Sequence, residues 1–370
     1  MAKKGEQKVL VAYEAGSDSL THWIEQFFED EIRGFRTKNV EKKIETQIRR
    51  FIAYMEKELG HDRISGVTKR IVREWRDHLY KNGKGFAAST VNNHKAHLSL
   101  YLGWIRKRVP HLLPEDPAKG KGLKDIQLPA PDIRALTDPQ LRSLINLLDR
   151  LERFYMMKGR KWANEPCPPL RKNARPKRNR AIVYLFLASG IRREMMVNID
   201  IDQVEPNDPD ALRAARRFRI NRITGKGLTE TNKIIIDKDA REALADYLEF
   251  ERPLDATSES RALFLNGLGD DGDDRMNVSR INKVVQKIGR MHDAEQTDPS
   301  RKIGPLTPHR FRHTYGVYLS LRSGGNVLLL QQELSHSNDR YLSTYTNLPD
   351  ELREDFLPRN HRGEDDEFRG

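Results

Sequence analysis

Apolar residues recur every three or four positions over most of the first hundred residues, which is the spacing of amphipathic helices. Residues 18–109 are therefore expected to form a compact bundle of four helices. Gly60 and Gly83 end two of the apolar stripes, as helix-stopping glycines do, and Ser89 begins the last helix. Residues 1–17 lack the periodicity and are expected to form a flexible tail.

Between residues 110 and 136 the pattern is interrupted by five prolines and two glycines. Proline sustains neither helix nor sheet, so this stretch is expected to be an extended linker between two domains. Thr137 and Gln140 have the spacing of a capping box, and apolar residues follow at helical spacing. They predict the first helix of a second domain, residues 137–350, which a C-terminal tail, residues 351–370, would follow.

The second domain is expected to contain helices and one pair of strands. Phe218–Ile223 and Lys233–Ile236 have strand composition and flank a turn that contains Gly225. Residues 158–180 form a basic stretch, which is interpreted as a solvated loop or as a further contact with DNA. Helices are expected from Ala181 onward and at 238–251, 279–291, 310–322 and 327–334. The predicted fold class is mainly α with a small β-sheet (α+β), in two domains.

Charge and cysteine content narrow the class of protein. Lys and Arg total 66 against 54 acids, a formal charge of +12, which favours a polyanionic partner such as double-stranded DNA. Charge alone does not decide between such a partner and a merely soluble basic protein. Cys167 is the only cysteine, so an internal disulfide framework is excluded. No long apolar run occurs, and we expect a cytoplasmic, nucleoid-associated protein without a membrane partner. Candidate DNA-backbone contacts are Lys69, Arg70, Arg73, Lys95, Arg175, Lys177 and Arg178.

The residues between His309 and Tyr345 carry the candidate chemistry. His309 and Arg312 are three positions apart, so a helix places them on one face. His336 and Tyr345 follow, with no cysteine and no acidic pair among these residues. Such a set offers many donors for a phosphate and few ligands for a metal. A tyrosine beside such residues is interpreted as a nucleophile that attacks a phosphodiester, and we expect no metal and no cofactor.

With Arg192 after Gly-Ile and Lys226 between two glycines, the set resembles the motifs of the tyrosine recombinase, or phage integrase, family. The resemblance spans residues 18–350 and carries that family's catalytic pattern onto Arg192, Lys226, His309, Arg312, His336 and Tyr345. It implies a helical, SAM-like core-binding domain and a catalytic domain that clamp DNA. It also implies a tetramer acting on two recombination sites through a Holliday junction.

The same resemblance implies a role for each side chain. A phenol with a pKa of about 10 is almost fully protonated at pH 7, so Tyr345 needs help to attack phosphorus. Arg192 and Arg312 would hold the non-bridging oxygens, where charge develops, and His336 would donate another hydrogen bond. Lys226 would protonate the leaving 5′ oxygen, and His309 would act in proton transfer near the nucleophile.

Several positions leave alternatives open. Arg193 is a rival for Arg192, and Lys233 for Lys226. Tyr341 and the more distant Tyr315 are rivals for the nucleophile. The family often has an acid at the position of Met195, so a carboxylate must come from elsewhere, or Glu194 must reach in. Ser335 stands where the family has glycine.

The activity expected from this set is site-specific cleavage and rejoining of DNA through a 3′-phosphotyrosyl link. The short N-terminus favours a simple recombinase, which is either an integrase or transposase of a mobile element or a chromosome-dimer resolvase. The basic stretch favours the mobile-element type, with integration, excision or transposition as the activity and possible accessory proteins. A type IB topoisomerase shares the tyrosine chemistry. A DNA-binding regulator with a decayed site is the alternative outside the enzymes.

Overall fold

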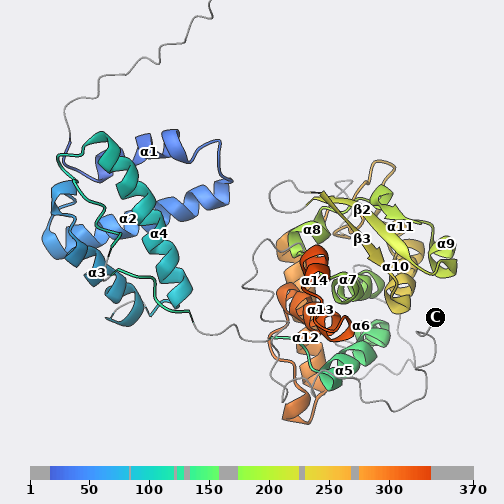
Figure 1. The fold of residues 1–370 in the computed structure, drawn as a ribbon. Helices are drawn as coiled ribbons and strands as arrows, with labels where there is room; N and C mark the ends of the chain where they lie inside the picture. The colour runs from blue at the N-terminus through green and yellow to red at the C-terminus, as the bar shows by residue number, and fades with distance from the viewer. Residues whose placement is uncertain are drawn as a thin grey trace, which may run out of the picture. The chain divides into compact units, whose positions relative to one another are not determined.

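The computed structural model describes residues 17–82, 85–120, 123–128, 134–157, 174–224, 230–267 and 275–334. The chain separates into two compact units, residues 1–130 and residues 131–370, which we call the N-terminal and C-terminal units (Figure 1). Both are mainly helical, and the C-terminal unit contains the one sheet of the described residues, as the fold class predicts. No helix in these ranges combines the length and apolar character needed to span a membrane.

The N-terminal unit contains the four predicted α-helices. They are α1 (Ile24–Glu31), α2 (Lys38–Leu59), α3 (Lys69–Asp77) and α4 (Ala88–Arg108), joined by short 3-10 and π-helical turns. Gly60 ends α2 in the left-handed conformation, with φ of 72°, which glycine adopts without steric cost. The apolar faces of all four helices form one core, in which Phe51 and Trp75 pack edge to face.

The segment after α4 differs from the extended linker predicted from its prolines. Leu113, Ala118 and Leu123 are buried in the core of the N-terminal unit. The side-chain amide of Asn92 donates to the carbonyl of Ile126 and accepts from its N–H, each at 2.9 Å. Proline prevents a helix here but does not prevent packing, so this part of the predicted linker belongs to the N-terminal unit.

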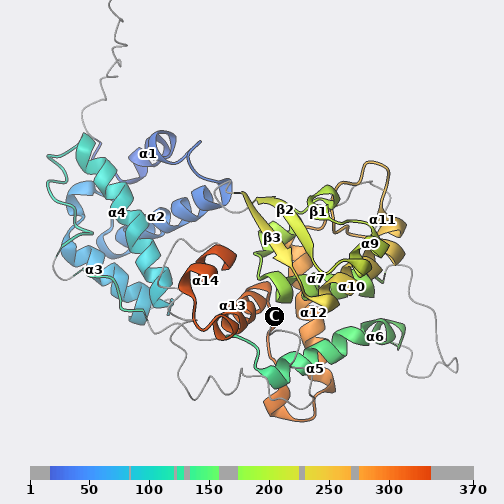
Figure 2. The same cartoon turned by 45° about the vertical axis from the view of Figure 1, so that its right-hand side comes forward.

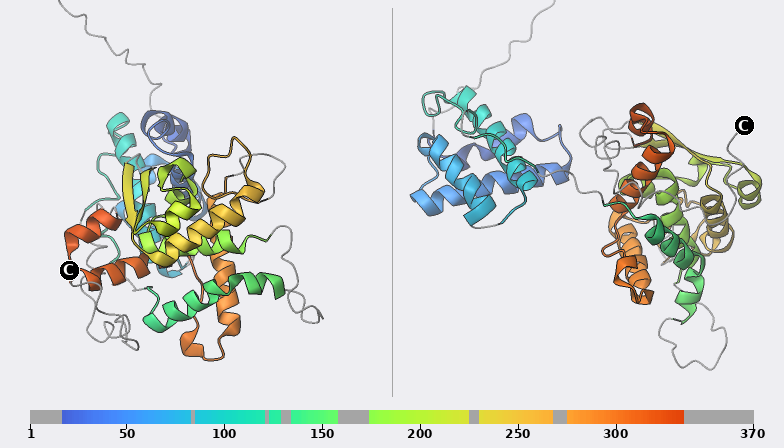
Figure 3. Two further views of the ribbon diagram at one scale, coloured as in Figure 1. Left: turned by 90° about the vertical axis from the view of Figure 1, so that its right-hand side faces the viewer. Right: turned by 60° about the horizontal axis from the view of Figure 1, so that its bottom comes forward.

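In the C-terminal unit, α7 (Pro176–Ser189) is the central helix, with almost every residue on its inner turns buried. It packs against α10 (Lys238–Phe250), α12 (Val278–Glu295) and α13 (Pro308–Arg322) (Figure 2). The sheet lies at one end of this unit and α5 (Asp138–Asp149) at the other (Figure 3). The remaining helices are α6 (Leu151–Met157), α8 (Arg193–Val197), α9 (Pro209–Ala214), α11 (Arg252–Asp255) and α14 (Val327–Leu334).

The sheet contains three antiparallel strands in the order β1-β2-β3. The predicted strand pair is confirmed as β2 (Phe218–Thr224) and β3 (Glu230–Ile235), with Phe218 opposite Ile235. An irregularity between Ile220 and Ile223 shifts the register, and Arg222 within it has φ of 50°. The sequence did not predict β1 (Val204–Glu205), because two residues are too short for a period to appear. The capping box of Thr137 and Gln140 at the start of α5 is confirmed.

The predicted basic stretch of residues 158–180 extends too far, because α7 begins at Pro176. The carboxylate of Glu251 accepts the backbone N–H of Lys177 at 3.0 Å and that of Arg178 at 2.8 Å. These N–H groups have no partner within the helix, and a carboxylate also suits the positive end of the helix dipole. A residue more than seventy positions away therefore sets the first turn of α7.

Two of the arginines proposed as DNA contacts lie inside the C-terminal unit. Arg175 donates to the carboxylate of Asp255 at 2.6 Å, and both side chains are buried. Arg178 donates to the carbonyls of Leu265 and Asn266, at 2.7 and 2.9 Å. Arg175 thus joins the start of α7 to the end of α11, and Arg178 holds a loop onto α7. This placement differs from the solvent-facing one that a phosphate contact requires.

We predict that Arg175→Ala lowers the free energy of unfolding by about 3–5 kcal/mol, because it leaves the buried carboxylate of Asp255 without its cation. Urea denaturation of the purified chain measures the change. The paired variant Arg175→Met with Asp255→Leu removes both charges and should lose less. Equal losses in the two variants would contradict an electrostatic origin.

Candidate functional site

Gly190 determines how the chain leaves α7 and reaches Arg192. It ends the helix in the left-handed conformation, with φ of 57°. A Cβ at this position would lie 2.4 Å from Cδ1 of Tyr315, so the ring leaves no room for a side chain. Two residues later the backbone is extended, and Arg192 occupies the N-cap of α8. The Gly-Ile-Arg spacing thus fixes where this arginine emerges.

A cleft in the C-terminal unit brings together three of the predicted catalytic residues. Arg192, His309 and Arg312 all line it, and its volume is about 560 Å³. Thr307 caps the first turn of α13, where its hydroxyl accepts the N–H of Arg310 at 3.3 Å. The helix then places His309 and Arg312 on the same face, as their spacing predicts.

The guanidinium of Arg312 is buried, with 3% of the residue exposed, and is bound to two helix ends. It donates to the carbonyl of Gly190 at 2.6 Å and to the carbonyl of Leu334. A guanidinium carries five N–H donors in a planar fork, and these two bonds account for two of them. Its orientation at the cleft is therefore fixed by backbone atoms of two other helices.

His309 lines the cleft and contacts His313, with 3.0 Å between the two Nε2 atoms. Burial lowers the pKa of His309, and the charges of Arg312, Arg134 and Arg192 lower it further. Because the cationic form is disfavoured, the imidazole stays neutral at pH 7. A neutral ring has one nitrogen that accepts a proton, as proton transfer requires.

Three predicted catalytic residues, Lys226, His336 and Tyr345, lie outside the described residues, and so does the rival nucleophile Tyr341. Their roles remain predictions. The other rival nucleophile, Tyr315, is described. Its hydroxyl donates to the carboxylate of Glu333 at 3.1 Å, and burial together with that charge raises its pKa. A phenol held in this way is harder to ionise, which argues against Tyr315.

The carboxylate expected at position 195 is replaced by an apolar side chain. Met195 is buried in the core of the C-terminal unit. Glu194 lines the cleft, but Arg193 Nε donates to its carboxylate at 2.8 Å. Glu194 is therefore paired with Arg193 at the surface. Glu333, at the end of α14, is the carboxylate next to the Leu334 carbonyl that Arg312 binds, and no motif of the sequence pointed to it.

Lys233, the rival of Lys226, is a buried lysine of β3 with 2% of its surface exposed. Its Nζ donates to Glu333 Oε2 at 2.7 Å and also to the backbone carbonyl of Glu333. Burial lowers the pKa of Lys233 and the pairing with Glu333 opposes the shift, while Arg312 and Arg192 add to the lowering. The charges of Glu333, Arg312 and Arg192 therefore all act on the ammonium group of Lys233.

Sequence reasoning missed three polar residues that also line the cleft. Asn282 and Gln286 project from α12, one turn apart, and Thr307 lies at the start of α13. Their amide and hydroxyl groups can donate to phosphate or to base edges. No recognisable motif contains them, because α12 approaches the arginines only in the folded chain.

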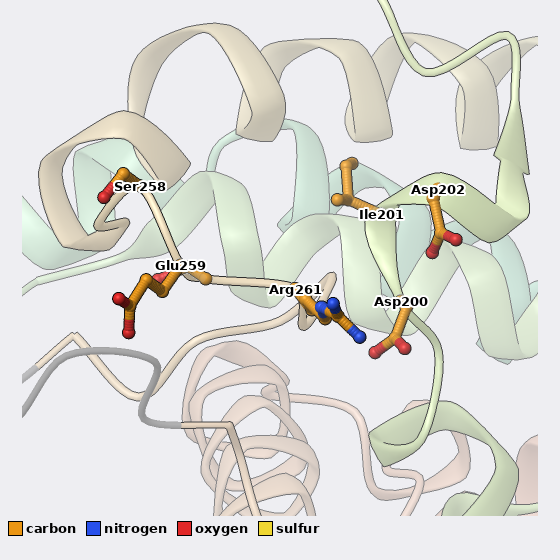
Figure 4. Close-up of a pocket in the computed structure, with 7 residues that line it drawn as sticks. Asp200, Ile201, Asp202, Ser258, Glu259 and Arg261 are labelled. Atoms are coloured by element: carbon orange, nitrogen blue, oxygen red, sulfur yellow. The ribbon is translucent and has the colours of Figure 1, made fainter.

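A second hollow of the C-terminal unit differs in charge. Figure 4 shows its lining, in which Asp200, Asp202 and Glu259 surround Arg261. Arg275 pairs with Asp200, and Arg222 pairs with Asp202 at 3.4 Å, so these carboxylates are already bound to cations. The first cleft is lined by Arg192, Arg193 and Arg312, which attract a phosphodiester. Among the described residues, no group of three His, Cys, Asp or Glu side chains could hold a metal ion.

The candidate DNA contacts of the N-terminal unit divide into two kinds. Lys69, Arg70 and Arg73 lie exposed on α3, and the first two pair with carboxylates at the surface. Lys95 is placed differently from a solvent-facing contact, since its Nζ donates to the carbonyl of Leu123 at 2.6 Å and the side chain is mostly buried. It holds the segment after α4 in place.

The profile of the phage integrase family matches residues 165–351, just over half of the chain. The chain therefore belongs to the phage integrase family. The match covers the cleft with Arg192, His309 and Arg312, together with the predicted positions Lys226, His336 and Tyr345.

Individual relatives and solved structures agree with this membership. Tyrosine recombinase XerC of Lactobacillus leichmannii is 27% identical over 173 residues, 46% of this chain and 50% of that protein. XerC of Vibrio cholerae serotype O1 is 30% identical over 172 residues, 46% of this chain and 47% of that protein. The matches thus span about half the length of these relatives.

The solved structures show the same fold over most of the chain. The Tn1549 transposon integrase in complex with circular intermediate DNA superposes with a TM-score of 0.62 at 16% identity, covering 91% of this chain and 99% of that one. The XerH site-specific recombinase bound to palindromic difH substrate gives 0.61 at 15% identity, covering 85% and 78%.

We predict that Arg192→Gln raises the pKa of His309, because it removes one of the positive charges that disfavour the imidazolium. In the unmodified chain the ring should therefore stay neutral to a lower pH than an unperturbed histidine, whose pKa is about 6.5. NMR titration of the ring protons measures both values. The matched control is Arg213→Gln on α9, and a pKa that fails to rise in Arg192→Gln would contradict this electrostatic account.

Proposed function

We propose that this chain is a site-specific DNA recombinase that cleaves and rejoins DNA through a 3′-phosphotyrosyl intermediate. The observation that carries the proposal is the cleft that gathers Arg192, Arg312 and the neutral His309. Two guanidinium groups beside a proton acceptor match the needs of phosphoryl transfer to and from a phenol. Membership of the phage integrase family supports the same chemistry.

In the proposed reaction, the phenol oxygen of Tyr345 attacks phosphorus and loses its proton to His309, directly or through water. The bond from phosphorus to the 5′ oxygen breaks, and Lys226 protonates that oxygen as it leaves. Arg192, Arg312 and His336 hold the non-bridging oxygens. The phosphotyrosyl link conserves the energy of the broken phosphodiester, so a free 5′ hydroxyl of another strand can reverse the step.

The finer proposal is integration, excision or transposition of a mobile element by four copies of the chain on two DNA sites. A complex of the similarly folded Tn1549 transposon integrase with circular intermediate DNA supports it. The N-terminal unit would bind the same DNA through Lys69, Arg70 and Arg73, and Lys177 is retained as a contact of the C-terminal unit. A chromosome-dimer resolvase, the other kind of simple recombinase, is the alternative.

The test is covalent capture on fragmented genomic DNA with EDTA present, comparing the unmodified chain with Tyr345→Phe. After quenching with SDS, protein-linked DNA is isolated and its ends are sequenced. We expect adducts through a 3′ phosphate, clustered at one sequence and absent from the variant. Adducts scattered over the genome would indicate a topoisomerase, and specific binding without adducts would indicate a regulator with a decayed site.

Arg312→Ala supplies a separate control for the assignment of the cleft. This variant should form at least about a hundredfold fewer adducts, because it loses an electrostatic contact in the transition state as well as the bonds to Gly190 and Leu334 that fix the cleft. Its affinity for DNA should change little, because one contact among many is lost. Adduct formation at the unmodified rate would contradict the proposed site.

We predict that replacing Lys69, Arg70 and Arg73 by Gln weakens DNA binding and flattens its salt dependence. Each lost phosphate contact lowers the slope of log K against log salt by about 0.9. Fluorescence anisotropy at several salt concentrations measures the slope. The control is a variant of the C-terminal unit in which Arg213, Arg217 and Lys238 are replaced by Gln. It loses the same net charge at another place, so it distinguishes an effect of α3 from an effect of net charge. Equal slopes in the two variants would exclude a specific role for α3.

A further inference from the structure

An ion pair between the buried Lys233 and the partly buried Glu333 joins β3 to the end of α14, next to the Leu334 carbonyl that binds Arg312. Lys233 Nζ donates to Glu333 Oε2 at 2.7 Å and to the backbone carbonyl of the same residue. The hydroxyl of Tyr315, on α13, donates to the same carboxylate at 3.1 Å. One carboxylate thus connects three elements of the C-terminal unit.

Two cations reach the last turn of α14 side by side. Lys233 binds the carbonyl of Glu333, and Arg312 binds the next carbonyl, that of Leu334. The last carbonyls of a helix have no partner within it, and together they carry partial negative charge. Buried cations at this end therefore fix the helix terminus, from which the chain continues to His336 two positions later.

We propose that Lys233 is a positioning residue of the recombination reaction, which holds Glu333 away from Arg312 and fixes the end of α14. This inference rests on the proposed function. Without Lys233, the Glu333 carboxylate would keep the Tyr315 hydroxyl and could pair with Arg312, which binds the adjacent carbonyl of Leu334. A carboxylate on that guanidinium would compete directly with the phosphate oxygens.

The alternative role for Lys233 is that of the acid which protonates the leaving 5′ oxygen. Its bonds to the Glu333 carboxylate and carbonyl, and its exposure of 2%, turn the ammonium toward α14 and away from solvent. Lys226 is the proposed acid. The two lysines are distinguished by the leaving group, since a thiolate leaves without a proton far more readily than an alkoxide.

The experiment uses the full chain and duplexes of the captured site that carry oxygen or sulfur at the 5′ bridging position. The rate of covalent adduct formation is measured in a single turnover. We expect Lys233→Met to slow the reaction at least tenfold, by the same factor with both duplexes, at nearly unchanged DNA affinity. Lys226→Met should be slow with oxygen and restored by sulfur.

A second variant, Lys233→Met with Glu333→Leu, removes both charges and leaves no unpaired buried ion. It should react faster than the single variant, because no carboxylate then competes for Arg312. If the single variant fails to fold, the double variant still distinguishes a positioning residue from the acid. An equal slowing of the double variant with both duplexes supports the positioning role of Lys233. Restoration of a Lys233 variant by sulfur would overturn the inference and make Lys233 the acid.

The two proposals fail in different ways. If the unmodified chain forms no adduct with either duplex, the proposed function fails. If the unmodified chain reacts and Lys233→Met reacts equally fast, only the role of Lys233 is overturned.

Discussion

The buried guanidinium of Arg312 links parts of the C-terminal unit that are far apart in the sequence. From α13 it reaches the carbonyl that ends α7 and the carbonyl that ends α14. A buried cation is stable only when partners replace its lost hydration, and helix ends supply carbonyls that nothing else satisfies. The geometry of the cleft, the exit of the chain toward Arg192 and the end of α14 therefore depend on one side chain.

Local sequence patterns predicted those parts of the fold that local physics determines. Apolar periodicity, the glycine after α2 and the capping box of α5 gave the helices of both units. Two of the departures from the predicted fold arose where a distant partner decides the structure. Asn92 binds Ile126, 34 positions away, and Glu251 caps the first turn of α7 from 74 positions away. Neither partnership leaves a trace in local periodicity or in proline content.

The candidate site divides in the same way. Motif spacing identified Arg192, His309 and Arg312, because each lies at a fixed distance from a helix end. Glu333 was not predicted, since its pairing with Lys233 joins residues 100 positions apart and belongs to no motif. Nor could the spacing show that Lys233 is buried and bound to Glu333, which is the property that argues against Lys233 as the acid.

The packing of the residues after α4 determines where this chain can be divided into stable fragments. A fragment that ends at Val109 would lose Leu113, Ala118 and Leu123 from its core and would expose the apolar surface that they cover. A fragment that continues through residue 128 keeps them. Because the two units have separate cores, a cut at that place divides the chain without dividing either core.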